Sequence, residues 1–357
     1  MVGKQSRQQG AGRVSLSEVA AIAEVSEATV SRVVNRRYGV SPQTRAAVED
    51  ALKELGYTRQ AKADMVLVLV PTLSNSFFGE MADELQTALI PYGFCAVVGA
   101  ALPGSGQELE YVESAVEMGM GAVVFLSASN TLRRADRSAP RLLTERGVPF
   151  VYIDGPLAEY PAPTCSSNDW GAAAIAVNYL ADLGHTRVGM LAGPVGHVPV
   201  DRRVEGFVQA MDERGLVGAE NLIERQYFTY DGGRHGCGAL LDLEVTAIIA
   251  ANDLMALGAV DHAHSRGLSV PQDLSVIGYD DSEALDFCSP PLTSLRQPRE
   301  RLAERTALLI EQMLSGRKVS AEEYLFDVEL HVRQSVAPPR AFARPSQVTE
   351  KATGDVG

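Results

Sequence analysis

The sequence lacks any apolar run approaching the roughly 18 residues that a membrane-spanning helix needs. Residues 1–12 are polar and lack the apolar core of an export signal, so we expect a cytoplasmic protein that contacts no membrane. Cysteine is also scarce, and no CxxC pair occurs among Cys95, Cys165, Cys237 and Cys288. This spacing argues against a disulfide framework and is typical of buried thiols in a reducing compartment.

Motifs of catalysis are missing as well. The six histidines show no HExxH or other metal-ligand spacing. The glycine-rich segment 231–236 fits neither GxGxxG nor a phosphate-binding P-loop, and no serine lies in a GxSxG pattern. The sequence therefore predicts a protein that is not an enzyme and has no catalytic residue, cofactor or metal site.

The chain has enough length and apolar content for two or three folded domains, with 357 residues of which 46% are hydrophobic and 22% charged. Its net charge of −13 argues at first against binding to nucleic acid. The charge is uneven, however. Residues 1–62 contain ten Lys and Arg against six acids, a net charge of +4, which leaves −17 on the remainder. A small basic head is therefore joined to a large acidic body.

The head, residues 14–57, has the pattern of three short helices. Val19 lies on the apolar face of the first, and Ser26 can cap a second helix that buries Val30. Ser41 and Pro42 are a typical start for the third. Two short helices joined by a tight turn predict a helix-turn-helix.

The exposed face of the second helix carries side chains that bond phosphates and base edges, namely Thr29, Ser31, Arg32 and Asn35. These residues favour binding to double-stranded DNA. A three-helix head of this size can also dock a protein, so this alternative stays open.

From residue 65 onward, short apolar runs alternate with amphipathic segments, which predicts a doubly wound α/β architecture. The pattern restarts near residue 187, which indicates two sheets. The expected strands are at 65–70, 94–98, 121–126, 150–153, 187–191, 247–250 and 274–278, and the expected helices at 79–91, 108–118, 172–183, 204–214, 256–266 and 299–314. The polar ends, 1–13 and 339–357, are expected to be disordered.

The sequence resembles the lactose-repressor (LacI/GalR) family of transcriptional regulators. The head carries the resemblance in VSLSEVA at 14–20 and VSEATVSRVVN at 25–35, and the body in VPTLSNSFF at 70–78, NDLMALG at 252–258, IGYDD at 277–281 and PPLTSLRQ at 290–297. The resemblance implies base contacts by Glu27, Ala28 and Arg32. It also implies contacts to the DNA backbone by Ser15, Ser26, Thr29, Ser31, Asn35, Ser41 and Thr44.

Two departures from the family pattern stand out in the head. Glu24 occupies the turn position where the family usually has Gly, which costs on the order of 1 kcal/mol if φ is positive. The linker at 58–64 is short and has no large apolar residue that could wedge into the minor groove. We therefore expect reading of the major groove together with phosphate contacts.

For the body, the resemblance implies a periplasmic-binding-protein-like fold of two lobes, the first spanning 65–162 and 296–324 and the second 163–292 and 325–338. Ligands of open α/β sheets bind at the carboxyl ends of the strands, where several matching segments lie. The implied ligand-binding residues are Asn75, Phe77, Asp154, His197, Arg203, Phe228, Asn252, Asp280 and Gln297. Carboxylates, amides, an arginine and aromatic rings suit a polyhydroxylated ligand such as a sugar.

Together these observations predict a homodimeric transcriptional regulator, a repressor, whose affinity for operator DNA is controlled by a small polar effector bound between two lobes. The alternative is a small-molecule sensor whose head contacts a protein rather than DNA.

Overall fold

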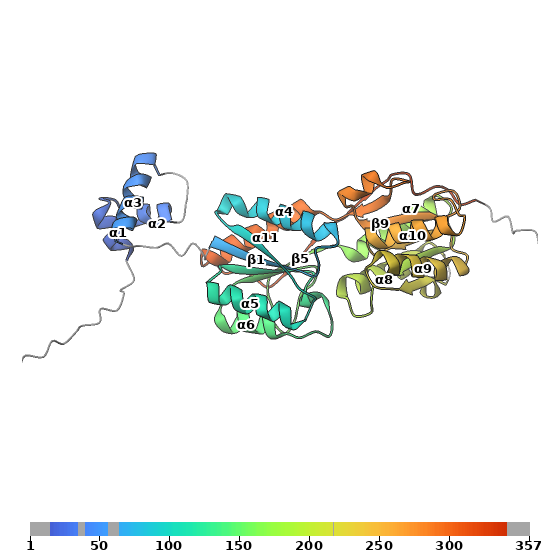
Figure 1. Ribbon diagram of the computed structural model, residues 1–357, viewed down its shortest axis with the longest axis horizontal. Coiled ribbons are helices and arrows are strands. Elements are labelled where there is room, and N and C mark those ends of the chain that lie inside the picture. The colour runs from blue at the N-terminus through green and yellow to red at the C-terminus, as the bar shows by residue number, and fades with distance from the viewer. Residues whose placement is uncertain (1–14, 35–39, 56–63, 217, 341–357) are drawn as a thin grey trace, which may run out of the picture.

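The computed structural model describes residues 15–34, 40–55, 64–216 and 218–340. In these residues a head of three helices precedes two α/β lobes that lie side by side (Figure 1). The predictions for residues 1–13, for Asn35, for all but the last residue of the 58–64 linker and for the tail beyond 340 lie outside the described residues.

The head consists of α1 (Leu16–Ile22), α2 (Glu27–Val34) and α3 (Pro42–Glu54). A serine hydroxyl caps each helix at its N-terminus: Ser15 accepts from the backbone N–H of Glu18, Ser26 from that of Thr29, and Ser41 from that of Thr44. The three helices enclose a small apolar core formed by Val19, Ala20, Val30, Val33, Val48 and Ala51.

Glu24 lies in the turn between α1 and α2 with φ of 54°, in the left-handed region that favours glycine. The conformation is thus the one expected where the family usually has Gly. A glutamate in this position costs the head on the order of 1 kcal/mol of stability.

The first lobe is built on a six-stranded parallel sheet in the order β11-β5-β4-β3-β1-β2. Its strands are β1 (Met65–Val70), β2 (Cys95–Ala100), β3 (Ala122–Leu126), β4 (Phe150–Ile153), β5 (Thr164–Ser167) and β11 (Glu323–Phe326). Helices α4 (Ser76–Leu89) and α11 (Arg299–Leu314) cover one face, and α5 (Gly106–Met118) and α6 (Ser138–Arg146) cover the other (Figure 1).

Strand β1 shows why the sequence gives a continuous apolar run rather than an alternating one. Val66, Val68 and Val70 pack toward α4 and α11, whereas Leu67 and Leu69 pack toward α5. Both faces of the strand are therefore buried, as is usual in parallel sheets.

The second lobe repeats the arrangement in the order β12-β10-β9-β8-β6-β7, in which only β12 is antiparallel to its neighbour. Its strands are β6 (Val188–Ala192), β7 (Ile223–Arg225), β8 (Ala247–Ala250), β9 (Ser275–Asp280), β10 (Thr293–Arg296) and β12 (Glu329–His331). Its helices pack in two pairs: α7 (Asp169–Asp182) with α8 (Val198–Glu213), and α9 (Tyr230–Asp242) with α10 (Asp253–Ser265).

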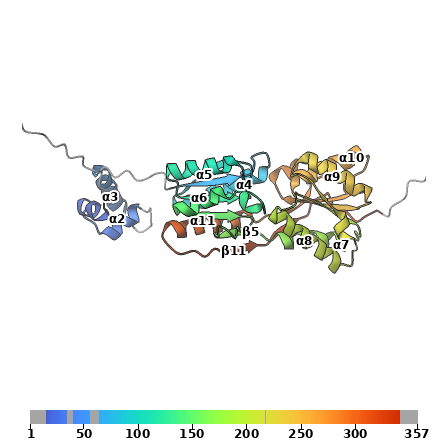
Figure 2. The same ribbon diagram turned by 90° about the horizontal axis from the view of Figure 1, so that it is seen from below.

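The chain crosses between the lobes three times, after β5, β10 and β11. Strands β5 and β11 lie next to each other in the first sheet (Figure 2), and β10 lies in the second. This corrects the lobe boundaries predicted from the sequence: the first lobe keeps 163–167 and extends to Phe326, and the second extends to Arg296. The prediction placed the first crossover too early because β5, Thr164–Ser167, carries small polar residues that give no apolar run.

In the part of the chain that the structure describes, we find no helix that is both long enough and apolar enough to span a membrane.

Candidate functional site

A cavity of about 430 Å³ lies between the two lobes, at the carboxyl ends of their strands. This is where loops from both sheets converge and where open α/β sheets bind ligands. The cavity is lined by all nine residues predicted to bind ligand, namely Asn75, Phe77, Asp154, His197, Arg203, Phe228, Asn252, Asp280 and Gln297.

Aromatic side chains form much of the cavity wall. Phe77 and Phe78 pack edge to face on the first-lobe side, with ring centroids 5.4 Å apart. On the second-lobe side Phe228 packs edge to face on His197 at 5.0 Å. Gly193 makes room for Phe228, because a Cβ at that position would lie 2.2 Å from the ring. Phe78 and Phe228 are half-buried and offer apolar surface to a ligand, whereas Phe77 is only 2% exposed and supports the wall from behind.

Arg203, on the buried face of α8, lies at the centre of the charged groups. Its guanidinium is 3.5 Å from the carboxylate of Asp169 and lies 3.9 Å from the centroid of the Tyr279 ring. The Tyr279 hydroxyl donates a hydrogen bond of 2.9 Å to the same carboxylate. Arg203 is therefore held in place before any ligand arrives, which lowers the entropic cost of binding.

Asp280 and Gln297 join the two lobes at the floor of the cavity. The Gln297 amide donates to Asp280 at 2.8 Å and accepts from Ser167 at 2.8 Å. The amide of Asn75, on the first lobe, donates to the other carboxylate oxygen of Asp280 at 3.4 Å. A relative movement of the lobes would therefore disturb this floor.

Backbone strain is concentrated at the loops around the site. Four non-glycine residues at the ends of strands have positive φ. Ser127 follows β3 (50°), Asp154 follows β4 (74°), and Asp280 and Asp281 end and follow β9 (111° and 54°). Non-glycine residues occupy this region at a cost of order 1–3 kcal/mol each, and such residues cluster at functional sites. The Ser127 hydroxyl donates to the Asp154 carboxylate and helps to hold one of these loops.

Burial changes the ionisation of the cavity's acids. It raises the pKa of Asp169 to about 7, although Arg203 acts in the opposite direction. It also raises the pKa of Asp154, and it raises that of Asp280 well above its ordinary value. Burial and then Arg203 lower the pKa of His197 to about 3, so this ring is neutral and can donate from one nitrogen and accept at the other.

Three buried polar atoms of residues that line the cavity have no hydrogen-bond partner within the described residues: Oδ2 of Asp169, Nε of Arg203 and Nδ1 of His197. An unsatisfied buried polar atom typically costs about 1–3 kcal/mol. Hydroxyl groups both donate and accept, so they are the kind of ligand group that could bond such atoms once the side chains around them shift.

The structure adds Asp169 and Tyr279 to the residues that sequence reasoning placed here. Asp169 is the first residue of α7 after a crossover strand that the sequence did not reveal, and Tyr279 lies inside the IGYDD segment, from which only Asp280 was expected in the site. Two predicted residues also stabilise the fold, because Asn75 caps α4 and Asn252 caps α10. Their roles in ligand binding stay predictions.

The lobes also touch along one side of the cavity. Leu132 of the first lobe forms an antiparallel bridge with His197 of the second, and the backbone N–H of Arg133 donates to the carbonyl of Gly196 at 2.8 Å. The Arg133 side chain lies 3.3 Å from the carboxylate of Asp201. This side of the cavity is therefore closed.

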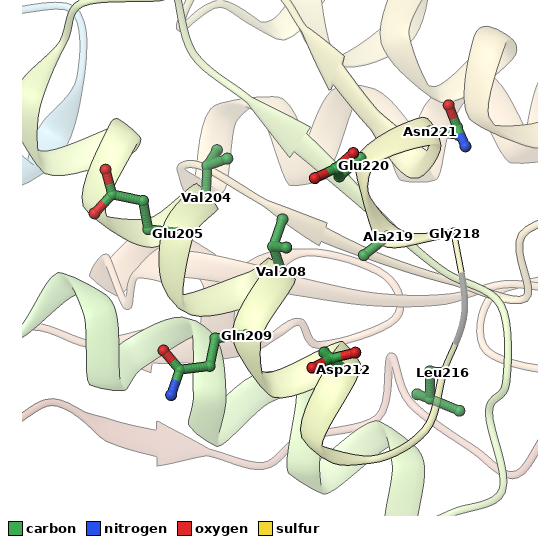
Figure 3. Close-up of a pocket in the computed structure, with 10 residues that line it drawn as sticks. All are labelled: Val204, Glu205, Val208, Gln209, Asp212, Leu216, Gly218, Ala219, Glu220 and Asn221. Carbon is green, nitrogen blue, oxygen red and sulfur yellow. The ribbon is translucent and has the colours of Figure 1, made fainter.

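A second hollow lies on the outer surface of the second lobe, between α8 and η4 (Ala219–Leu222) (Figure 3). Val204 and Val208 line it together with the exposed acids Glu205, Asp212 and Glu220. It contains none of the predicted ligand-binding residues and no cationic side chain among those that line it. Within the described residues no group of three or more His, Cys, Asp or Glu could hold a metal ion.

In the head, the residues predicted to contact bases lie on the surface of α2, where Glu27, Ala28 and Arg32 are exposed. Ser15, Ser26 and Ser41, three of the predicted phosphate contacts, are the N-caps described above. Backbone N–H groups at helix N-termini attract anions, so these positions suit phosphate groups. Thr29, Ser31 and Thr44 are half-buried.

We expect Arg32→Ala to weaken binding to a preferred operator, selected from a random duplex pool, by about 1–3 kcal/mol, because a bidentate contact to guanine would be lost. Binding to random duplex should fall much less. Fluorescence anisotropy on both duplexes measures this, with Lys53→Ala on α3 as a control that removes one charge away from α2. An equal loss on both duplexes would make Arg32 a phosphate contact.

Two family models match the chain. Residues 15–60 match the bacterial regulatory proteins of the lacI family, and residues 177–336 match a periplasmic binding protein-like domain.

Two similar curated proteins are transcriptional regulators. An HTH-type regulator in the aml 5′ region of Streptomyces limosus is 41% identical over 332 residues, covering 90% of this chain and 94% of that protein. MalR of Streptomyces coelicolor is 37% identical over 340 residues, covering 92% and 99%.

Solved structures show the same architecture. The complex of the transcriptional regulator CelR with cellobiose has a TM-score of 0.70 and 33% identity, covering 90% of this chain and all of that one. The lac repressor dimer, bound to its operator and the anti-inducer ONPF, has a TM-score of 0.67 and 26% identity, covering 91% and 100%.

Proposed function

The chain belongs to the LacI family of bacterial regulatory proteins, and on this premise we propose that it is a repressor that binds operator DNA as a homodimer and responds to a sugar. The sugar binds in the cavity between the lobes. The lac repressor structure, a dimer on its operator, supports the assembly, and the complex of CelR with cellobiose supports the ligand class.

The observation that carries this proposal is the set of unpartnered polar atoms on Asp169, Arg203 and His197, residues that line the cavity together with amides, carboxylates and aromatic rings. A sugar has hydroxyls around its rim and apolar C–H faces. The hydroxyls can bond the polar groups of Asp169, Arg203 and His197, and the faces can pack on Phe78 and Phe228, whose side chains are half-buried.

The same cavity gives a route from ligand to DNA. Its floor and one side consist of contacts between the lobes, and the ion pair Arg202–Glu323 (2.6 Å) joins α8 of the second lobe to β11 of the first. A ligand that favours one placement of the lobes changes the separation of the two heads in the dimer. Such coupling typically amounts to ~1–3 kcal/mol in operator affinity.

A thermal-shift screen of monosaccharides, disaccharides and nucleosides on the full chain tests the proposal. A sugar present at ~100 times its Kd should add about 2.7 kcal/mol to the free energy of unfolding. The same sugar should change the anisotropy of a labelled operator duplex in the presence of the protein. If nucleosides stabilise the chain and no sugar does, the ligand class is wrong.

A further inference from the structure

The cavity has two chemically different ends. The three unpartnered polar atoms and the floor residues are buried on the inner side. Leu102 and Tyr227 also line the cavity, yet Leu102 is 70% exposed and Tyr227 is 76% exposed. Both therefore lie at its mouth, where the cavity opens to solvent.

The two mouth residues come from opposite lobes. Leu102 follows β2 and Tyr227 follows β7, and β2 and β7 are the terminal strands at corresponding edges of the two sheets. Single exposed apolar residues are common on protein surfaces and need no explanation. An exposed leucine and an exposed tyrosine that border the same opening from two lobes form a surface that a ligand can contact on both sides.

The position of Tyr227 is fixed by its own backbone. Its carbonyl oxygen accepts from the N–H of Thr229 at 2.7 Å. Gly232 in the first turn of α9 lies so close that a Cβ there would be 2.2 Å from this carbonyl. The backbone of Tyr227 is thus anchored to the start of a helix, which fixes the point at the mouth from which the aromatic side chain projects.

We propose that Tyr227 and Leu102 form an outer subsite, which holds the second ring of a disaccharide or longer saccharide while the inner polar groups hold the first. The inference rests on the proposed sugar-binding function and specifies its ligand. The inner end supplies bonds for hydroxyls, and the outer end supplies an aromatic face and an apolar side chain for the C–H face of a ring. A monosaccharide would leave the outer subsite empty.

Calorimetric titration of the full chain with glucose, galactose, maltose, cellobiose, lactose and trehalose tests this subsite. At least one disaccharide should bind the wild type ~10-fold or more tighter than its constituent monosaccharide. Tyr227→Ala should remove that advantage and leave monosaccharide affinity unchanged, whereas Tyr227→Phe should retain it. Tyr230→Ala, which removes a nearby exposed tyrosine outside the cavity lining, serves as the matched control.

The outcomes separate the two proposals. If the wild type binds disaccharides and Tyr227→Ala binds them equally well, the outer subsite is wrong and the sugar-binding function stands. If Tyr227→Ala lowers the affinity for monosaccharides and disaccharides equally, Tyr227 supports binding of the first ring rather than the second. This result would also overturn the outer subsite. If the wild type binds no saccharide, both proposals fail. The melting temperature of each variant checks that it is folded.

Discussion

Replacing Arg203 with alanine is expected to lower sugar affinity by at least ~100-fold, equivalent to about 2.8 kcal/mol, and to abolish the response of operator binding to sugar. Among the described residues that line the cavity, the guanidinium is the only cation, and its Nε has no partner. In the wild type the positive charge of Arg203 lowers the pKa of Asp169 and so opposes the effect of burial. Without that charge the pKa of Asp169 rises further, and its carboxyl takes up a proton in the variant. That uptake limits the destabilisation expected from breaking a buried ion pair.

Operator binding without sugar should be unchanged in Arg203→Ala, because α8 lies in the second lobe and the DNA-reading residues lie in the head. Arg214→Ala removes another ion-paired arginine, at the C-terminal end of the same helix and away from the cavity, and should respond to sugar normally. Titration of sugar into the protein and into its complex with operator measures both effects. A normal sugar response in Arg203→Ala would show that the cavity is not the effector site.

The sequence predicted the head well because its structure is dictated locally. A serine precedes each helix, and its hydroxyl satisfies a backbone N–H that would otherwise have no partner. Even the left-handed turn could be anticipated, and Glu24 has the positive φ that the family's glycine would have. The longer apolar strands of both sheets were found for a similar reason, since burial on both faces requires a continuous apolar run.

Helix α9 was missed because glycine argues against a helix when only the sequence is considered. Gly233 and Gly258 lie where α9 and α10 cross, and a Cβ on either would be within 2.1 Å of a backbone oxygen of the other helix. The glycine-rich segment that fitted no phosphate-binding motif is thus a helix contact surface. This requirement comes from a partner that is distant in sequence, so no local pattern could reveal it.

Asp169 shows the same limit at the cavity. Most of the residues that the sequence predicts for the site lie in segments that match the family or, like Asp154, follow a clear apolar strand. Asp169 follows β5, whose small polar side chains give no strand pattern. Its position beside Arg203 depends on a crossover between the lobes, which brings the start of α7 against α8. Its importance is therefore visible only in three dimensions.

Asp169 should also make the stability of the ligand-free protein depend on pH. Burial raises the pKa of its carboxyl from 3.8 to about 7 in the folded chain. Between these values the folded state keeps a proton that the unfolded state has lost, so the contribution of Asp169 to the free energy of unfolding falls as pH rises. From pH 5.5 to pH 8 this contribution should fall by about 2 kcal/mol.

Comparison with Asp169→Asn isolates this effect. His197 acts in the opposite direction below pH 6.5, because burial lowers the pKa of its ring, but it is present in both proteins and its direct contribution cancels. Relative to the variant, the wild type should therefore lose stability from pH 5.5 to pH 8, measured as unfolding free energies by urea titration. Asp182→Asn changes an exposed carboxylate on the same helix and should follow the wild type. Parallel curves for wild type and Asp169→Asn would mean that the Asp169 carboxyl is ionised throughout this range, with Arg203 outweighing the cost of its burial.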